Sequence, residues 1–161
     1  THLGGALAAA MKRHKLALGR DVAIVISTDG THYGSDFQYT PFGLGGVEAY
    51  IKALTQDREL ILSTLAGAVS ADKAQTFFAA VVNPDKLDQY RMPWCGRFSV
   101  PFGLVLLAET AKRLGLPPPR GLPLLLGASV DTPQLKIPGI GPTAPASLYH
   151  FVTQPALAFV R

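Results

Sequence analysis

The sequence predicts an α/β fold: a layered sheet flanked by helices, in a single domain over residues 1–161. Short apolar runs rich in β-branched residues alternate with longer segments whose apolar residues recur at helical spacing. Strands interleaved with helices are typical of layered α/β domains. Hydrophobic residues make up 48% of the chain and charged residues 16%. This composition excludes a disordered protein and is sufficient for a hydrophobic core.

The first elements are a helix and a strand. A helix is expected over residues 5–17, where a basic run faces water and Gly19 ends the helix. The run 22–26, Val-Ala-Ile-Val-Ile, has the length and β-branched content of a fully buried strand, so we expect a strand over 21–26.

Three more helices follow in the sequence. Residues 47–65 show strong amphipathic periodicity, and Ser70 is placed to cap a shorter helix that ends before Asn83. A helix is expected from Ser99 to Leu114, apolar on nearly all sides and therefore central to the core.

A strand is expected over residues 122–128, and a closing strand or hairpin over 148–160. Pro155 interrupts the second of these, which predicts a place at the sheet edge. The proline-rich segment 132–146 between them is expected to be an irregular loop. Three strands are few for this length, and the chain opens on Thr1, so we expect a fragment whose sheet is completed by other material.

Composition excludes several classes of protein. The net charge of +4 comes with one basic run, residues 12–15, which lacks interleaved aromatic residues, so we expect a solvated helix face and no nucleic-acid partner. No apolar run reaches the roughly 18 residues of a membrane span, so no membrane association is expected. A single cysteine excludes an internal disulfide framework and predicts a reducing compartment, the cytoplasm.

The most informative motif is Ser-Thr-Asp-Gly-Thr-His-Tyr-Gly at residues 27–34, directly after the expected strand. Ligands of α/β domains collect outside the carboxyl ends of strands. His32 is suited to metal ligation or general base work because imidazole titrates near neutrality, although a loop histidine can also bind a backbone carbonyl. Asp29 could ligate a metal, orient His32 or cap the turn.

The second motif is Trp-Cys-Gly-Arg at residues 94–97, near the start of a helix. A guanidinium and a helix N-terminus both favour the thiolate form of a nearby cysteine, whereas a free cysteine can also be a small core residue. Arg97 could hold a carboxylate or form a surface ion pair. If the fold brings the two motifs together, Asp29, His32 and Cys95 indicate a metal or redox site.

In combination, the motifs resemble those of the Memo family, known in bacteria and archaea as AmmeMemoRadiSam system protein B. The residues that carry the resemblance are 26–34, then Phe-Gln-Tyr-Thr at 37–40, and Cys-Gly-Arg at 95–97 with Pro-Phe-Gly at 101–103. The similarity covers essentially the whole chain, but only the carboxyl-terminal half of a family member.

The resemblance implies a fold like that of type III extradiol ring-cleaving dioxygenases, and a pocket built from histidines of both halves plus the cysteine. At the matching positions of this sequence, the resemblance implies iron or copper as the cofactor, with His32 and Cys95 as metal ligands. It also implies His32 and Asp29 as catalytic residues. The pocket residues that it implies are Ser27, Tyr33, Tyr39 and Arg97. The missing amino-terminal half or a homo-oligomer partner would supply the rest of the site.

We therefore expect a Memo-like metal-binding protein with dioxygenase-like or redox activity, an oxidoreductase by class. Cysteine in place of a carboxylate departs from the usual ligand set of oxygenases and favours metal binding or redox chemistry over ring cleavage. An alternative is a non-catalytic module for a peptide or small-molecule ligand, anchored on an aromatic rim of Tyr33, Phe37, Tyr39, Phe42 and Trp94. A third hypothesis, a hydrolase with Ser27 and His32, lacks the nucleophile-elbow motif.

Overall fold

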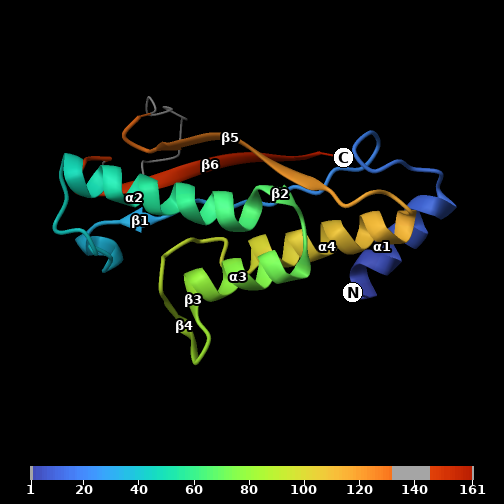
Figure 1. Cartoon of the computed structure of the whole chain (residues 1–161), viewed down its shortest axis with the longest axis horizontal. Coiled ribbons are helices and arrows are strands. Elements are labelled where there is room, and N and C mark those ends of the chain that lie inside the picture. Colours follow the sequence, from blue (N-terminus) through green and yellow to red (C-terminus); the bar gives the residue numbers. More distant parts are fainter. Residues whose placement is uncertain (1, 132–145, 161) are drawn as a thin grey trace, which may run out of the picture.

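The computed structural model describes residues 2–131 and 146–160. It is a mixed α/β structure, as predicted, with a curled four-stranded sheet in the order β1-β6-β5-β2 (Figure 1). The strands are β1 (His32–Tyr33), β2 (Gly67–Ala68), β5 (Arg120–Ala128) and β6 (Phe151–Val160). Each pairing within this sheet is antiparallel.

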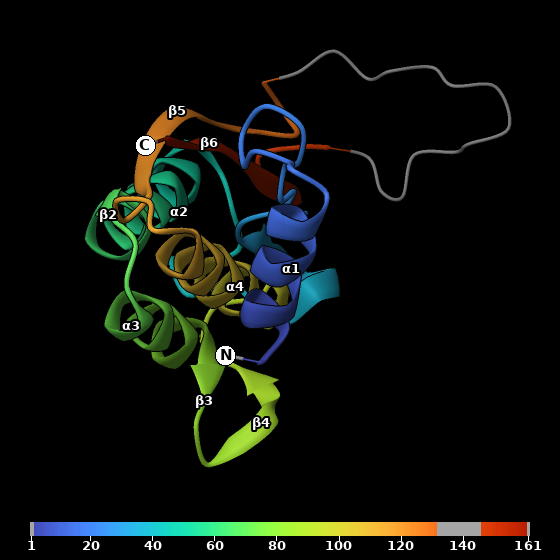
Figure 2. The same cartoon turned by 90° about the vertical axis from the view of Figure 1, so that its right-hand side faces the viewer.

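The helices lie on one side of the sheet (Figures 1 and 2). They are α1 (His2–Arg13), α2 (Val47–Leu60), α3 (Ala71–Val81) and α4 (Ser99–Leu114), and α2 continues into a turn of π-helix, η2 (Ile61–Leu65). A short 3-10 helix, η1 (Ser35–Phe37), follows β1. The helical predictions for 47–65 and for Ser99–Leu114 are confirmed, and Gly115 ends α4 in the left-handed conformation with φ 73°.

The expected helix over 5–17 is shifted toward the amino terminus, because α1 ends at Arg13. Lys15 has a φ of 54°, and the Leu16 amide donates to the carbonyl oxygen of Met11 at 2.9 Å. This turn reverses the chain, so that Leu18 is buried beside Met11 against α4. In Figure 2, α1 lies alongside α4.

The helix that begins after Ser70 is confirmed, since the Ser70 hydroxyl accepts from the Lys73 amide at 3.2 Å. The sequence did not predict the hairpin that follows, β3 (Val82–Asn83) with β4 (Lys86–Tyr90). All five residues of β4 are exposed. The strand therefore lacks the alternation of apolar and polar residues by which a half-buried strand is predicted.

The prediction of a fully buried strand over 21–26 is wrong. This segment belongs to neither sheet, and only Val22 forms an isolated bridge, to Leu18. Its residues alternate between exposed and partly buried, and Val25 is 88% exposed. The run is apolar enough for burial on both faces, but among the described residues only one face meets the core.

The closing strand is found as β6, but not at the sheet edge, since it lies between β1 and β5. Pro155 lies opposite Leu126 within the β5–β6 ladder, near a register shift between Pro123 and Leu125. On the other side of β6, β1 covers only Phe151 and Val152. Proline is therefore tolerated because β6 is paired on both sides only at its start. The loop expected at 132–146 lies outside the described residues apart from Ala146.

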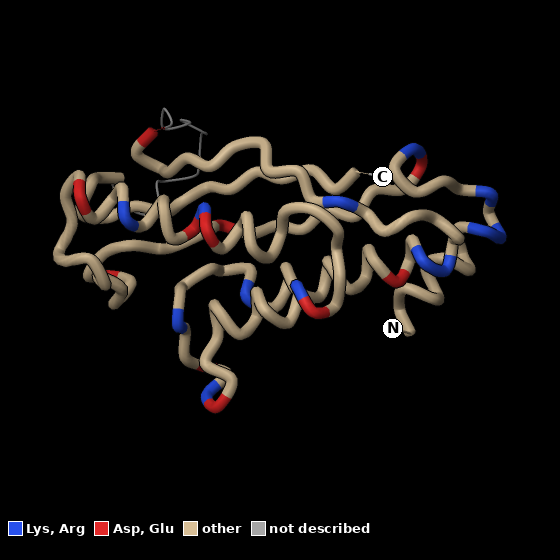
Figure 3. Tube along the Cα trace, viewed as in Figure 1, with Lys and Arg blue, Asp and Glu red and all other residues tan. Residues whose placement is uncertain are grey.

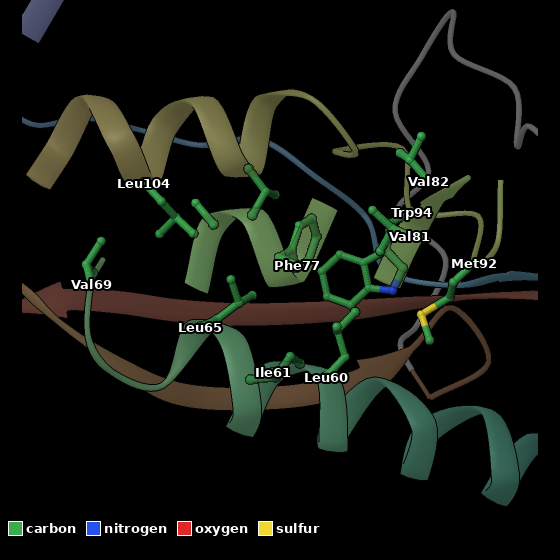
Figure 4. Packing of buried hydrophobic residues seen from close by; sticks show 12 residues of the cluster. Leu60, Ile61, Leu65, Val69, Phe77, Val81, Val82, Met92, Trp94 and Leu104 are labelled. Carbon is green, nitrogen blue, oxygen red and sulfur yellow. The ribbon is translucent and has the colours of Figure 1, made fainter. Parts of the chain in front are cut away.

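The main core lies where η2, α3 and α4 meet the sheet (Figure 4). Phe77 of α3 and the indole of Trp94 are fully buried and pack edge to face, with ring centroids 5.3 Å apart. Leu65 and Leu104 fill the space around them. This core holds Trp94 in place, and with it the turn that carries Cys95.

Charge is unevenly distributed over the fold (Figure 3). Basic residues gather at the end of α1 and in the loop after it, whereas β6 carries no charged side chain. Within the described residues, every helix is too short or too polar to cross a membrane.

Candidate metal site

Three segments converge on the site: the end of the extended run 21–30, strand β1 and the turn before α4. Thr31 and Trp94 form an isolated antiparallel bridge, and the His32 amide donates to the Pro93 carbonyl at 3.2 Å. This pairing sets the two sequence motifs side by side, although more than sixty residues separate them in the chain.

Asp29, His32 and Cys95 form a compact cluster. Each offers one ligand atom, and the three atoms all lie within 4.8 Å of one another. The Nε2 of His32 lies 3.7 Å from Oδ2 of Asp29, and the Asp29 amide donates to the Cys95 Sγ at 2.9 Å. The structure therefore brings together the three residues that the sequence singled out for metal or redox chemistry.

The imidazole of His32 is partly buried, and one of its nitrogens is left unpaired. Its Nε2 is the one buried side-chain nitrogen or oxygen without a hydrogen-bond partner among the described residues. Burial lowers the pKa of His32; the Asp29 carboxylate opposes this effect, and the nearby His150 adds to it. The ring is therefore neutral at pH 7, with a lone pair available to an ion. Phe37 packs against it edge-on, with centroids 4.9 Å apart.

Cys95 is exposed and lies in a tight turn. Its Sγ is 3.8 Å from the Thr28 hydroxyl, which also accepts from the Gly96 amide at 3.0 Å. A Cβ on Gly96 would lie 2.2 Å from the Thr28 Oγ1, so only glycine allows this close approach. The thiol thus faces the extended run, where the Asp29 amide donates to its sulfur.

Sequence reasoning missed a buried carboxylate that supports the site, Asp57 of α2, which is 0% exposed. Its Oδ1 accepts from the Thr31 hydroxyl at 2.7 Å and from the Trp94 indole N–H at 2.8 Å. Its Oδ2 accepts from the Thr31 amide at 3.0 Å and from the Thr153 hydroxyl. Asp57 therefore holds the neighbours of His32 and Cys95 to each other and to β6.

A signal for Asp57 was present in the sequence. The residue shares one helical face with Ala49, Ala53 and Leu60, all of which are buried. An acidic residue within an apolar stripe requires buried partners, because an unpaired buried charge is costly. Gly30 makes room for it, since a Cβ there would lie 2.8 Å from Oδ2 of Asp57.

The four expected pocket residues lie in different surroundings. Ser27 is exposed, and its carbonyl oxygen accepts from the Ser99 hydroxyl at 3.2 Å. Tyr33 is fully buried: its hydroxyl donates to the Gly43 carbonyl at 2.6 Å, and its ring stacks on Phe151. Tyr33 thus belongs to the core, because its hydroxyl finds partners inside the fold.

Tyr39 and Arg97 are also engaged away from the cluster. Burial raises the pKa of Tyr39, whose hydroxyl donates to Gln56 at 3.4 Å. The guanidinium of Arg97 lies over the ring of Tyr90 in β4, 4.2 Å from its centroid, and over Phe98 at 4.9 Å. Among the described residues, neither side chain has a hydrogen bond or ion pair with Asp29, His32 or Cys95.

The aromatic rim expected of a binding module is only partly at the surface, since Tyr33 and Trp94 are 0% exposed. Phe37 remains beside the cluster, where its ring also stacks on His150 at 4.5 Å. The Nε2 of His150 lies 3.7 Å from Oδ2 of Asp36. A second imidazole thus lies close to the site, although the sequence indicated only a strand residue there.

The residues present fit a transition-metal ion. The cluster offers a nitrogen, a sulfur and an oxygen donor, and Nε2 of its imidazole is buried without a hydrogen-bond partner. Imidazole suits iron, copper and zinc, and thiolate favours softer ions such as Cu(I). A comparison with protein-family models and a search of curated proteins both find no match to this chain.

Proposed function

We propose that this chain is a Memo-like metal-binding protein that holds iron or copper through His32 and Cys95 and supports redox or dioxygenase-like chemistry. In this proposal its fold corresponds to the carboxyl-terminal half of the family's fold. Asp29 contributes the third donor, or accepts a proton beside the ion. The support is the pair of motifs that resemble the family, together with the geometry of the cluster.

One observation carries the proposal: His32 has a buried Nε2 without a hydrogen-bond partner, and a nitrogen of its ring lies within 4.8 Å of a carboxylate oxygen and of the only thiol of the chain. An unpartnered buried polar atom is costly, and a bound ion would remove that cost. Convergence of three different donor types from segments far apart in sequence is also what a metal site requires.

When bound, iron or copper would supply electron transfer and polarisation of an oxygen-containing substrate. The chain's own residues have distinct tasks. His32 presents a neutral nitrogen because burial disfavours its charged form. The Asp29 amide donates to the Cys95 sulfur and fixes its position beside the imidazole. The Asp29 side chain is 54% exposed, so its carboxylate is open to water and to a substrate.

The test is anaerobic titration of the metal-free protein with Fe(II) and with Cu(I). His32→Ala and Cys95→Ser should each weaken binding by about tenfold or more, since each removes a ligand. His14→Ala is the matched control, because His14 is exposed and lies outside the cluster, and it should bind as the unmodified chain does.

With Cu(II), a thiolate-to-copper absorption band should appear in the unmodified chain and be missing in Cys95→Ser. Unchanged stoichiometry and affinity in both ligand variants would remove the proposal. Binding that is lost only in Cys95→Ser would show a thiol-bound ion that does not use His32.

A further inference from the structure

The side chain of Thr28 joins the two sequence motifs beside the cluster. Its hydroxyl donates to the carbonyl oxygen of Asp29 at 2.7 Å and accepts from the amide of Gly96 at 3.0 Å. The same oxygen lies 3.8 Å from the sulfur of Cys95. One partly buried side chain thus contacts both the segment that leads to His32 and the turn that carries the thiol.

Hydrogen bonds join residues 27–32 to residues 93–99, and we call this set of contacts the seam. At one end of the seam the backbones pair directly, through an antiparallel bridge and a hydrogen bond at 3.2 Å. At the other end, the Ser99 hydroxyl donates to the Ser27 carbonyl at 3.2 Å. Thr28 lies between these two ends, so its hydroxyl joins the segments where their backbones no longer pair.

Backbone pairing stops here because residues 95–98 form a turn. The amide of Gly96 is buried, and its hydrogen-bond acceptor among the described residues is the Thr28 hydroxyl. A buried N–H group without an acceptor is costly, so this hydroxyl holds the turn against the extended run. The contact is close as well as polar, since a Cβ on Gly96 would lie 2.5 Å from the Cβ of Thr28.

The sulfur of Cys95 is positioned from the same place. It accepts from the Asp29 amide at 2.9 Å. Its other hydrogen-bonding neighbours within residues 2–131 and 146–160 are the Thr28 hydroxyl and the Asp29 carbonyl, both at 3.8 Å. The Thr28 hydroxyl donates to that carbonyl and so orders the backbone that faces the sulfur. Because Cys95 is exposed, these polar contacts fix its side chain where core packing does not.

We propose that Thr28 is a positioning residue of the candidate metal site. Its hydroxyl fixes the turn at residues 95–98 and thereby holds the Cys95 sulfur within reach of the same ion as the His32 imidazole. The inference rests on the proposed function. Thr28 itself is not a ligand: it acts through the thiol, because a ligand that is already in place loses less conformational freedom when an ion binds.

The test is anaerobic titration with Fe(II) and Cu(I), together with the thiolate-to-copper absorption band that Cu(II) gives. Thr28→Val keeps the shape of the side chain and removes the hydroxyl. It should weaken binding by about tenfold or more, because the sulfur is no longer held in place. It should also shift or weaken the absorption band. Thr28→Ser restores the hydroxyl and should bind and absorb as the unmodified chain does.

The matched control is Ser99→Ala, which removes another hydroxyl of the seam, one that bonds the main chain at Ser27 and not the turn. It should leave the affinity and the absorption band unchanged. Equal effects of Ser99→Ala and Thr28→Val would overturn the inference, because the seam as a whole would then hold the thiol. Normal binding and absorption by Thr28→Val would overturn it too. If the unmodified chain binds neither ion, the proposed function itself fails.

Hydrogen exchange of the metal-free, unmodified chain tests the positioning without an ion, and decides the inference even if Thr28→Val does not fold. The reference is the Cys95 amide in the same turn, which has no hydrogen-bond acceptor among the described residues. The Gly96 amide should exchange about tenfold more slowly or less than this reference, because the Thr28 hydroxyl holds it. Equally fast exchange of the two amides would show that the hydroxyl does not fix the turn, and would overturn the inference.

Discussion

At the scale of single residues, the candidate site depends on groups that are not ligands. Asp57 accepts four hydrogen bonds, and its donors include Thr31 and Trp94, the immediate neighbours of His32 and Cys95. The side chains of Thr31, Trp94 and Thr153 are fully buried, so no water can replace the carboxylate. The relative placement of imidazole and thiol is therefore set by a residue of α2.

Replacing Asp57 by Asn should destabilise the fold by about 3 kcal/mol, because a buried amide turns an N–H group toward donors that need an acceptor. Urea unfolding measures this difference in free energy. Asp88→Asn, on exposed β4, is the control and should leave stability nearly unchanged. A loss at position 57 no larger than at 88 would show that the network contributes little.

The imidazole of His32 should titrate below its ordinary pKa of 6.5 in the metal-free protein, because burial penalises its charged form more than Asp29 favours it. The unfolded chain then binds the proton first as pH falls, so the free energy of unfolding should decrease as pH drops below about 6.5. Imidazole NMR signals follow the titration directly. His32→Gln should lack this part of the pH dependence, and a His32 pKa at or above 6.5 would contradict the expectation.

At the scale of elements, the approach of α1 to α4 depends on one small residue. Gly4 is buried, and a Cβ there would lie 2.9 Å from the Cβ of Glu109 and 3.3 Å from the Thr110 backbone nitrogen. At Gly5, next in the same helix, a Cβ would have no neighbouring atom within 4 Å among the described residues. A side chain at position 4 would therefore collide with α4, whereas a side chain at position 5 would not.

Gly4→Ala should destabilise the protein by about 1–3 kcal/mol, because α1 must move away from α4. Gly5→Ala should instead stabilise it by about 0.5–1 kcal/mol, through the helix propensity of alanine. Thermal unfolding of the two variants compares them under one condition. Equal effects of the two substitutions would show that α1 does not pack on α4 as described.

At the scale of the whole molecule, polar contacts join the helices to the sheet. One of them links α2 to the turn after β5: the Tyr50 hydroxyl lies 2.7 and 2.6 Å from the two carboxylate oxygens of Asp131. Asp131 also accepts from the Ala128 amide at 2.8 Å. Desolvation, with the hydrogen bond to Asp131 and its charge, raises the pKa of Tyr50 to about 12.

This contact predicts an alkaline limit to stability. A raised pKa in the folded state means that the unfolded chain loses its proton first, near pH 10. The contribution of Tyr50 should therefore be complete below about pH 10 and be lost as pH rises toward 12. Urea unfolding between pH 7 and 11 should show a smaller decrease for Tyr50→Phe, whereas Tyr149→Phe, with an exposed side chain, should behave like the unmodified chain.

The sequence by itself determined the helices and the identity of the candidate site residues. Periodicity located α2 with η2 and α4, and the Ser70 cap located α3, because these are local features of the chain. The residue types of Asp29, His32 and Cys95 indicated metal or redox chemistry before their distances were known. Such features can be predicted from the sequence because the cap and the apolar periodicity of a helix lie within its own residues.

Only the tertiary structure decided which residues meet. Contacts between distant segments form the bridge between Thr31 and Trp94 and bury the carboxylate of Asp57. Such contacts also place Tyr33 in the core. The run 22–26 shows the same limit: its composition is that of a buried strand, but burial requires a neighbour, and the described residues supply one on one face only. A strand's partner is a long-range property, so the failure of this run to join a sheet could not be predicted from the local pattern.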